Sequence, residues 1–228
     1  MRDSDIPYDV SSVARRAFCR HFSLLAAGAL LARSAAAAPV GAPAPTVLVV
    51  GDSLSAEYGL ARGAGWVALL EARLAREHIA AQVVNASISG DTTSGGRSRL
   101  PALLARHKPK LVVLELGGND ALRGLPLAGT QDNLTVMARA AKAAGAKVLI
   151  VGMAMPANYG RKYAESFQSL FGTVAKVEGA SLVPFLLAGV ADGPDADAMF
   201  QPDRIHPKAE AHPRMLANVW PVLAPMLR

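Results

Sequence analysis

Five short apolar segments alternate with longer amphipathic segments along this chain. The apolar segments are rich in Val, Leu and Ile, and they cover residues 47–50, 82–86, 111–116, 147–151 and 181–184. The amphipathic segments cover residues 66–78, 96–107, 131–144, 162–178 and 207–227. Strands that alternate with helices at this spacing form right-handed βαβ units around one parallel sheet. The pattern therefore predicts an α/β fold, a flavodoxin-like three-layer α/β/α sandwich with a central sheet of about five parallel strands.

The composition is typical of a compact globular protein. The chain has 228 residues, of which 51% are hydrophobic and 18% are charged, and residues 46–228 are enough for a single domain with its own core. The formal net charge is +6, and residues 1–38 contribute +2 of it through five Arg and three Asp. The remaining charge favours solubility. No run of Lys and Arg interleaved with aromatic residues is present, so we expect no nucleic-acid partner.

Residues 1–38 have the three-part layout of an export signal. Arg15 and Arg16 precede a mostly apolar stretch at residues 21–31, and small residues follow it. This stretch is too short to span a membrane, so we expect no stable membrane insertion. The arginine pair is similar to that of a twin-arginine signal. The sequence thus predicts a periplasmic or secreted protein, and the alternative is a disordered cytosolic extension.

Cleavage of this signal is expected near Ala37, which leaves residues 39–45 as a Pro/Ala linker before the domain. Cys19 is the one cysteine of the chain, and it would be removed with the signal. The mature protein would then have no disulfide and no thiolate metal site. No His, Asp or Glu residues follow a metal-binding spacing either, so we expect no metal and no cofactor. We also expect a monomer.

A serine stands at the end of the first apolar segment. Ser53 follows residues 47–50 directly after a Gly-Asp pair, at the carboxyl end of a strand, where open α/β folds keep their chemistry. A serine hydroxyl needs a base within hydrogen-bond reach and a third group that orients the base. Asp203 and His206 have the right types and spacing, because a carboxylate three residues before an imidazole can fold back onto Nδ1 while Nε2 faces Ser53. An Asp-x-x-His loop on its own is more often a helix cap, but together the three residues predict a Ser-His-Asp triad.

Acyl transfer also requires donors for the oxygen that becomes negative. The third apolar segment ends in Gly117 and Gly118, which allow a tight turn that directs the Asn119 amide across the strand ends. Gly90 follows the second segment and offers a backbone N–H. With the amide of Ser53, these groups predict an oxyanion hole of three donors, although either glycine cluster alone reads as an ordinary turn.

Four ordered blocks of this chain resemble those of the GDSL, or SGNH, hydrolase family. The blocks are Gly51-Asp52-Ser53-Leu54-Ser55, Gly90, Gly117-Gly118-Asn119-Asp120 and Asp203-x-x-His206-Pro207. Longer strings at residues 84–92, 115–120 and 156–161 resemble the bacterial branch of multifunctional thioesterases, lysophospholipases and arylesterases. The resemblance covers about residues 47–227. It implies Ser53 as the nucleophile, Asp203 and His206 as the other triad members, Gly90 and Asn119 in the oxyanion hole, and a periplasmic location.

Substrate contacts are expected on both sides of the nucleophile, from Asp52 and Leu54. The resemblance also implies that the segment of Pro156, Asn158 and Tyr159 borders the acyl site, and the alternative is a plain turn. One departure concerns Arg204, where the family commonly has Gly. If that position needs a positive φ, the loop is expected to bend differently here, with Arg204 pointing outward.

The sequence thus predicts a serine hydrolase that cleaves carboxylic esters and thioesters, with a small acyl or aryl substrate. A carbohydrate O-deacetylase of the same fold is an alternative, which the low aromatic content of 5% disfavours. A second alternative is a non-catalytic periplasmic protein that binds acyl chains. A transferase with an alcohol acceptor would use the same catalytic residues.

Overall fold

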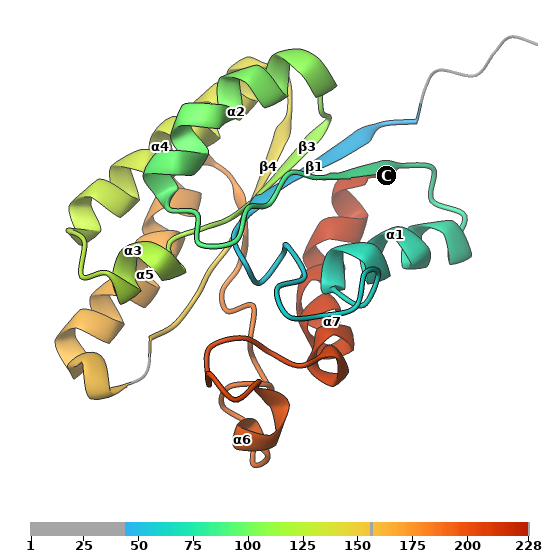
Figure 1. Ribbon diagram of the computed structural model, residues 1–228. Helices are drawn as coiled ribbons and strands as arrows, with labels where there is room; N and C mark the ends of the chain where they lie inside the picture. Colours follow the sequence, from blue (N-terminus) through green and yellow to red (C-terminus); the bar gives the residue numbers. More distant parts are fainter. Residues whose placement is uncertain (1–43, 156, 228) are drawn as a thin grey trace, which may run out of the picture. The chain divides into compact units, whose positions relative to one another are not determined.

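The computed structural model describes residues 44–155 and 157–227. Its centre is one sheet of five parallel strands in the order β2-β1-β3-β4-β5 (Figure 1). The strands are β1 (Thr46–Gly51), β2 (Gln82–Asn85), β3 (Leu111–Glu115), β4 (Lys147–Val151) and β5 (Ser181–Val183). This is the strand order of flavodoxin-like folds. The predicted fold class is therefore confirmed, and each strand ends within two residues of its predicted bounds.

The strands in the middle of the sheet are covered on both faces. Residues 47–50 of β1 and 111–114 of β3 have no exposed surface, and β4 is buried from Val148 onward. Parallel strands are buried in this way because the crossover helices pack on both faces, which is why they read as continuous apolar runs rather than alternating ones.

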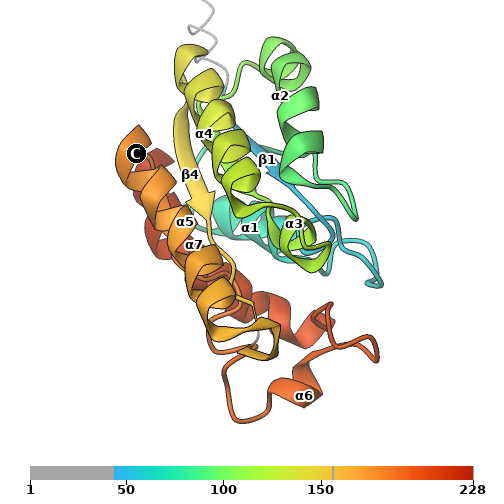
Figure 2. The same ribbon diagram turned by 90° about the vertical axis from the view of Figure 1, so that its left-hand side faces the viewer.

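The longer helices form the two outer layers (Figures 1 and 2). On one face α1 (Trp66–Arg76) packs against α7 (His212–Leu223). On the other face α4 (Leu127–Ala143) lies between α2 (Thr93–His107) and α5 (Arg161–Glu178). Among the described residues, no helix is both long enough and apolar enough to cross a membrane.

The final helix begins later than the sequence predicts. Residue Pro207 is extended and pairs with Phe200 in an antiparallel bridge, so the helix cannot start there. The chain instead continues through a short 3-10 turn, η2 (Ala209–Ala211), into α7. Pro213 then lies in the first turn of α7, where its missing N–H costs nothing. A second 3-10 turn, η3 (Ala224–Leu227), follows α7.

Three short helical segments were not predicted, namely α3 (Gly118–Leu122), η1 (Ala157–Tyr159) and α6 (Ala196–Met199). Each is too short to show a helical period in its sequence. The predicted signal at residues 1–38 and most of the linker lie outside the described residues.

The strand order reverses at β1, because β2 lies on one side of it and β3 on the other. The loops that follow these three strands therefore meet at one edge of the sheet, which is where ligands bind in open α/β folds.

Candidate active site

Three side chains from distant parts of the chain form a hydrogen-bonded row at this edge. Ser53 follows β1, and its Oγ lies 2.9 Å from Nε2 of His206. Nδ1 of the same imidazole lies 2.7 Å from Oδ2 of Asp203. The structure thus brings together the three residues in which the sequence predicts a triad. A hydroxyl, an imidazole and a carboxylate in this order can move a proton from the serine as it attacks.

The turn at residues 203–206 is held by the Asp203 carboxylate itself. Its Oδ1 accepts backbone hydrogen bonds from Ile205 at 2.9 Å and from His206 at 3.0 Å, while Oδ2 faces the imidazole. Desolvation raises the pKa of Asp203, but these bonds and the charge of His206 outweigh it and hold the pKa at about 2. Asp203 is therefore ionised throughout the neutral range, as a group that stabilises an imidazolium must be.

Arg204 occupies the position where a glycine is common in the family, and its φ is +57°. The expectation that a non-glycine residue would bend the loop differently is therefore wrong. The turn keeps the left-handed conformation and carries its strain, because Asp203 bonds both following N–H groups. Arg204 is exposed, as the sequence analysis expected.

Tyr58 packs against the imidazole of His206. The ring centroids of Tyr58 and His206 lie 4.3 Å apart, with an angle of 37° between the planes. Gln201 joins the two loops, since its Nε2 donates to the carbonyl oxygens of Tyr58 at 3.0 Å and of Pro207 at 3.2 Å. Tyr58 could not be placed at the site from the sequence, because its position depends on the path of the loop after Ser53.

The predicted oxyanion donors line the same pocket. The pocket has a volume of about 280 Å³ and is lined by Ser53, Tyr58, Ser89, Gly90, Asn119 and His206. Gly90 has a φ of +78°, a conformation that glycine adopts without strain. Gly117 has a φ of +125° and is the N-cap residue of α3, the helix that carries Asn119.

Asp52 and Leu54 do not line this pocket, which corrects the expectation that they contact substrate. Asp52 is 3% exposed and Leu54 is 6% exposed. The carboxylate of Asp52 instead accepts hydrogen bonds from the Leu54 N–H at 3.0 Å and from Nδ2 of Asn119 at 3.1 Å. Asp52 therefore orients the Asn119 amide through a buried carboxylate. Burial raises the pKa of Asp52 to about 6, against the opposing effects of the Leu54 and Asn119 hydrogen bonds and of the His206 charge.

The remaining residues that were expected to border the acyl site lie elsewhere or are not described. Asn158 and Tyr159 belong to η1 and are exposed, and neither lines the pocket around Ser53. Pro156 lies outside the described residues.

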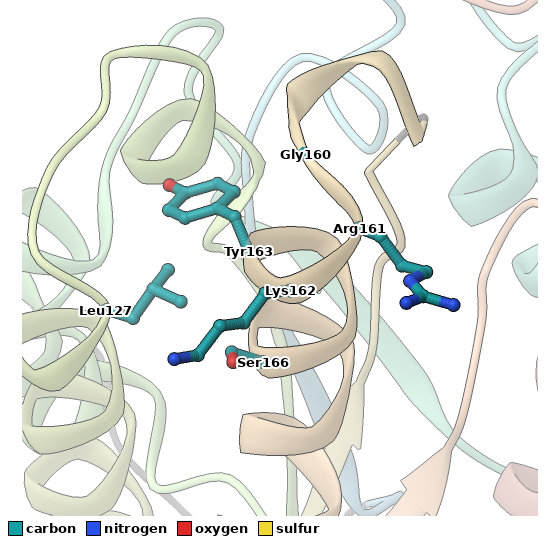
Figure 3. A pocket seen from close by; sticks show the side chains of 6 residues that line it. All are labelled: Leu127, Gly160, Arg161, Lys162, Tyr163 and Ser166. Carbon is teal, nitrogen blue, oxygen red and sulfur yellow. The ribbon is translucent and has the colours of Figure 1, made fainter.

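A second pocket, of about 540 Å³, opens at the start of α5 and is lined by Leu127, Gly160, Arg161, Lys162, Tyr163 and Ser166. Lys162 points toward Leu127 across this pocket, whereas Arg161 points to the other side of the helix (Figure 3). The hydroxyl of Tyr163 donates to the Ala121 carbonyl at 3.3 Å, so this wall also supports α3. Within residues 44–155 and 157–227, no three His, Cys, Asp or Glu side chains are grouped so that they could hold a metal ion.

Comparison with known proteins shows which family this chain resembles. The model of the GDSL-like Lipase/Acylhydrolase family matches residues 49–214. The chain is 56% identical to Esterase TesA of Pseudomonas aeruginosa over 186 residues. This matched region covers 82% of this chain and 91% of the relative. The chain is 44% identical over 172 residues to Thioesterase 1/protease 1/lysophospholipase L1 of Escherichia coli K12, across 75% of this chain and 80% of the relative.

A solved structure is also similar. The psychrotrophic esterase EstA from Pseudoalteromonas sp., inhibited by monoethylphosphonate, superposes with a TM-score of 0.75 at 36% identity, over 80% of this chain and 98% of that one. The family match covers the end of β1, the other four strands and the turn that carries Asp203 and His206. The resemblance seen in the sequence is thereby confirmed, and this chain is a member of the GDSL-like lipase/acylhydrolase family.

Proposed function

We propose that this protein hydrolyses carboxylic esters and thioesters through an acyl-enzyme on Ser53. The observation that carries the proposal is the 2.9 Å distance between Ser53 Oγ and His206 Nε2, beside a pocket that Gly90 and Asn119 line. A nucleophile, a base and donors for an oxyanion are the groups that acyl transfer requires. A protein that only binds acyl chains needs no such combination.

In the first half-reaction, Ser53 Oγ attacks the acyl carbon and its proton passes to Nε2 of His206. The carbonyl oxygen becomes negative and accepts hydrogen bonds from the amides of Ser53 and Gly90 and from the Asn119 side chain. Asp203 stabilises the imidazolium. As the tetrahedral intermediate collapses, the bond to the leaving alcohol or thiol breaks, and His206 gives that group its proton.

In the second half-reaction, water attacks the acyl-enzyme and loses a proton to His206. The same donors hold the second oxyanion, and Ser53 Oγ leaves and takes the proton back. The carboxylic acid is released and the enzyme returns to its starting state.

The names of the relatives support this substrate class. The P. aeruginosa relative is an esterase, the E. coli relative is named for thioesterase and lysophospholipase activities, and a relative from Vibrio mimicus at 41% identity is an arylesterase. We therefore place aryl esters, acyl thioesters and lysophospholipids among the substrates to be tested first.

The test is hydrolysis of p-nitrophenyl esters from acetyl to palmitoyl, together with acyl-CoA thioesters. It compares the wild type, Ser53→Ala and the control Ser169→Ala, whose exposed hydroxyl lies on α5. We expect turnover that only Ser53→Ala abolishes, and the optimum chain length defines the preferred substrate. Products formed with added alcohols separate hydrolysis from transfer. No turnover on any substrate, by a protein that folds cooperatively, would overturn the proposal.

We also infer that residues 1–38 direct export and that the mature domain is a periplasmic or secreted monomer. The arginine pair, the apolar stretch and the small residues before position 39 support the inference of export. Expression of the full chain, cell fractionation and N-terminal sequencing test it, with Arg15→Lys and Arg16→Lys combined to block the twin-arginine route. An uncleaved cytosolic protein would contradict the export inference, and a dimer in sedimentation would contradict the monomer.

A further inference from the structure

The oxyanion donors come from separate elements on opposite sides of the nucleophile strand. Gly90 follows β2 and Asn119 follows β3, and β1 lies between these two strands. No strand pairing joins β2 to β3, so the sheet alone does not fix the distance between the two donors. Contacts between the loop at residues 86–92 and helix α3, together with the hydrogen bond from the Ile88 N–H to the Gly51 carbonyl, help to set that distance.

One contact of this kind is buried. The carboxylate of Asp120, in α3, accepts hydrogen bonds from the backbone N–H of Thr93 at 2.9 Å and from the Thr93 hydroxyl. Thr93 begins α2, three residues after Gly90. This contact fixes α3 against the start of α2, but it does not involve residues 88–90. Ile88 and Ser89 are exposed.

The second contact reaches Gly90 directly. Nη2 of Arg123 donates a 2.8 Å hydrogen bond to the Gly90 carbonyl oxygen. The backbone N–H of Arg123 donates to the Asn119 carbonyl at 3.2 Å, so the same residue is bonded to both of the residues that supply oxyanion donors from outside the Ser53 loop. Glycine has the greatest backbone freedom of all residues, and Gly90 has a positive φ, so an external bond restrains it more than it would another residue.

We propose that Arg123 is a positioning residue that couples the two oxyanion donors, holding the Gly90 backbone at its working distance from Asn119. This inference rests on the proposed function, because it concerns the same hole. An arginine suits the task, since its planar and permanently charged guanidinium donates in fixed directions. The bond is exposed, and without Arg123 water would satisfy the Gly90 carbonyl. Its loss therefore changes the geometry of the hole more than the stability of the fold.

The test uses Arg123→Met, which keeps the apolar part of the side chain. The matched control is Arg97→Met, because Arg97 is an exposed arginine on α2 whose guanidinium bonds Asp132 and Asn133. With a neutral p-nitrophenyl ester, we expect kcat of Arg123→Met to fall about 10-fold with KM unchanged, part of the loss that removal of a whole donor causes. Melting temperature should stay at the wild-type value, and millimolar guanidinium ion should restore kcat of Arg123→Met but not that of Asn119→Ala.

A second readout does not depend on activity. Hydrogen exchange of the Gly90 amide, followed by NMR, should be faster in Arg123→Met than in the wild type and in Arg97→Met. If kcat or Gly90 exchange of Arg123→Met equals that of the wild type, the coupling role is overturned. Ser53-dependent turnover of the wild type would then still support the proposed function. A wild type without Ser53-dependent turnover would overturn the proposed function instead, and the exchange measurement would still decide whether Arg123 restrains Gly90.

Discussion

Ser55 lies two residues after the nucleophile, and its hydroxyl donates a 2.6 Å hydrogen bond to Oε2 of Glu115. The same hydroxyl accepts a hydrogen bond from the Trp66 indole at 3.2 Å, and Glu115 Oε2 lies 3.4 Å from the backbone N–H of Asp52. Glu115 thus joins the end of β3 to the loop that carries Ser53. It is 3% exposed, and burial, followed by the nearby Asp52 carboxylate, raises the pKa of Glu115 well above its usual range.

This buried carboxyl predicts a stability that depends on pH. Above about pH 4.5, the reference pKa of Glu115, the unfolded chain releases its proton while the folded chain keeps it. The folded state then binds more protons, so Glu115 makes the free energy of unfolding fall as pH rises toward its folded pKa. Glu115→Gln keeps an oxygen acceptor for Ser55 and does not titrate. Its melting temperature, relative to the wild type, should increase steadily from pH 5 to pH 8.

The comparison within one pH series cancels the groups that titrate alike in both proteins. The remaining difference reports Glu115 together with the Asp52 carboxylate that interacts with it. Glu71→Gln, at an exposed position of α1, is the control. A difference between Glu115→Gln and the wild type that stays constant over the series would show that Glu115 has an ordinary pKa.

A second prediction concerns the pair of Asp52 and Asn119. Asn119→Ala removes an oxyanion donor and should lower kcat on the order of 10²-fold or more, with little change in KM. Asp52→Asn leaves one oxygen for two donors, the Leu54 N–H and the Asn119 amide, so it should lower kcat by a smaller factor. If Asp52 acts through Asn119, the double variant should be no slower than Asn119→Ala. Losses that multiply in the double variant would mean that Asp52 acts independently.

The fold, and the grouping of Ser53, Asp203 and His206 in one hydrogen-bonded row, could be predicted because their signals are local. Buried parallel strands are continuous apolar runs, and the Asp203 to His206 spacing itself allows the carboxylate to reach the imidazole. What could not be predicted depends on tertiary contacts. Asp52 and Leu54 flank Ser53 in sequence but are buried, whereas Tyr58 reaches the imidazole through the path of its loop.

A third prediction follows from the ring contact of Tyr58 with His206. An aromatic face beside an imidazole stabilises the positive charge that forms during attack, and it also limits the ring's rotation. Tyr58→Phe keeps the ring and should retain most activity, whereas Tyr58→Ala should lower kcat/KM for a p-nitrophenyl ester about 10-fold. Steady-state kinetics of the two variants decide the point. Equal activity of Tyr58→Ala and the wild type would exclude a role for the ring.

The last prediction concerns the strained turn between Asp203 and His206. Arg204 has a φ of +57°, which costs a residue with a Cβ about 1 to 2 kcal/mol relative to glycine. Arg204→Gly removes this cost, but the greater backbone entropy of the unfolded chain opposes it by about 0.5 to 1 kcal/mol. The substitution should therefore stabilise the fold by up to about 1.5 kcal/mol and leave kcat for a neutral ester unchanged. Arg204→Val places a β-branched residue in the same conformation. It should destabilise the fold and lower kcat, because Asp203 would lose its alignment with the imidazole. Urea denaturation and kinetics of the two variants provide the measurement, and equal stability of Gly and Val at this position would show that the turn is not strained.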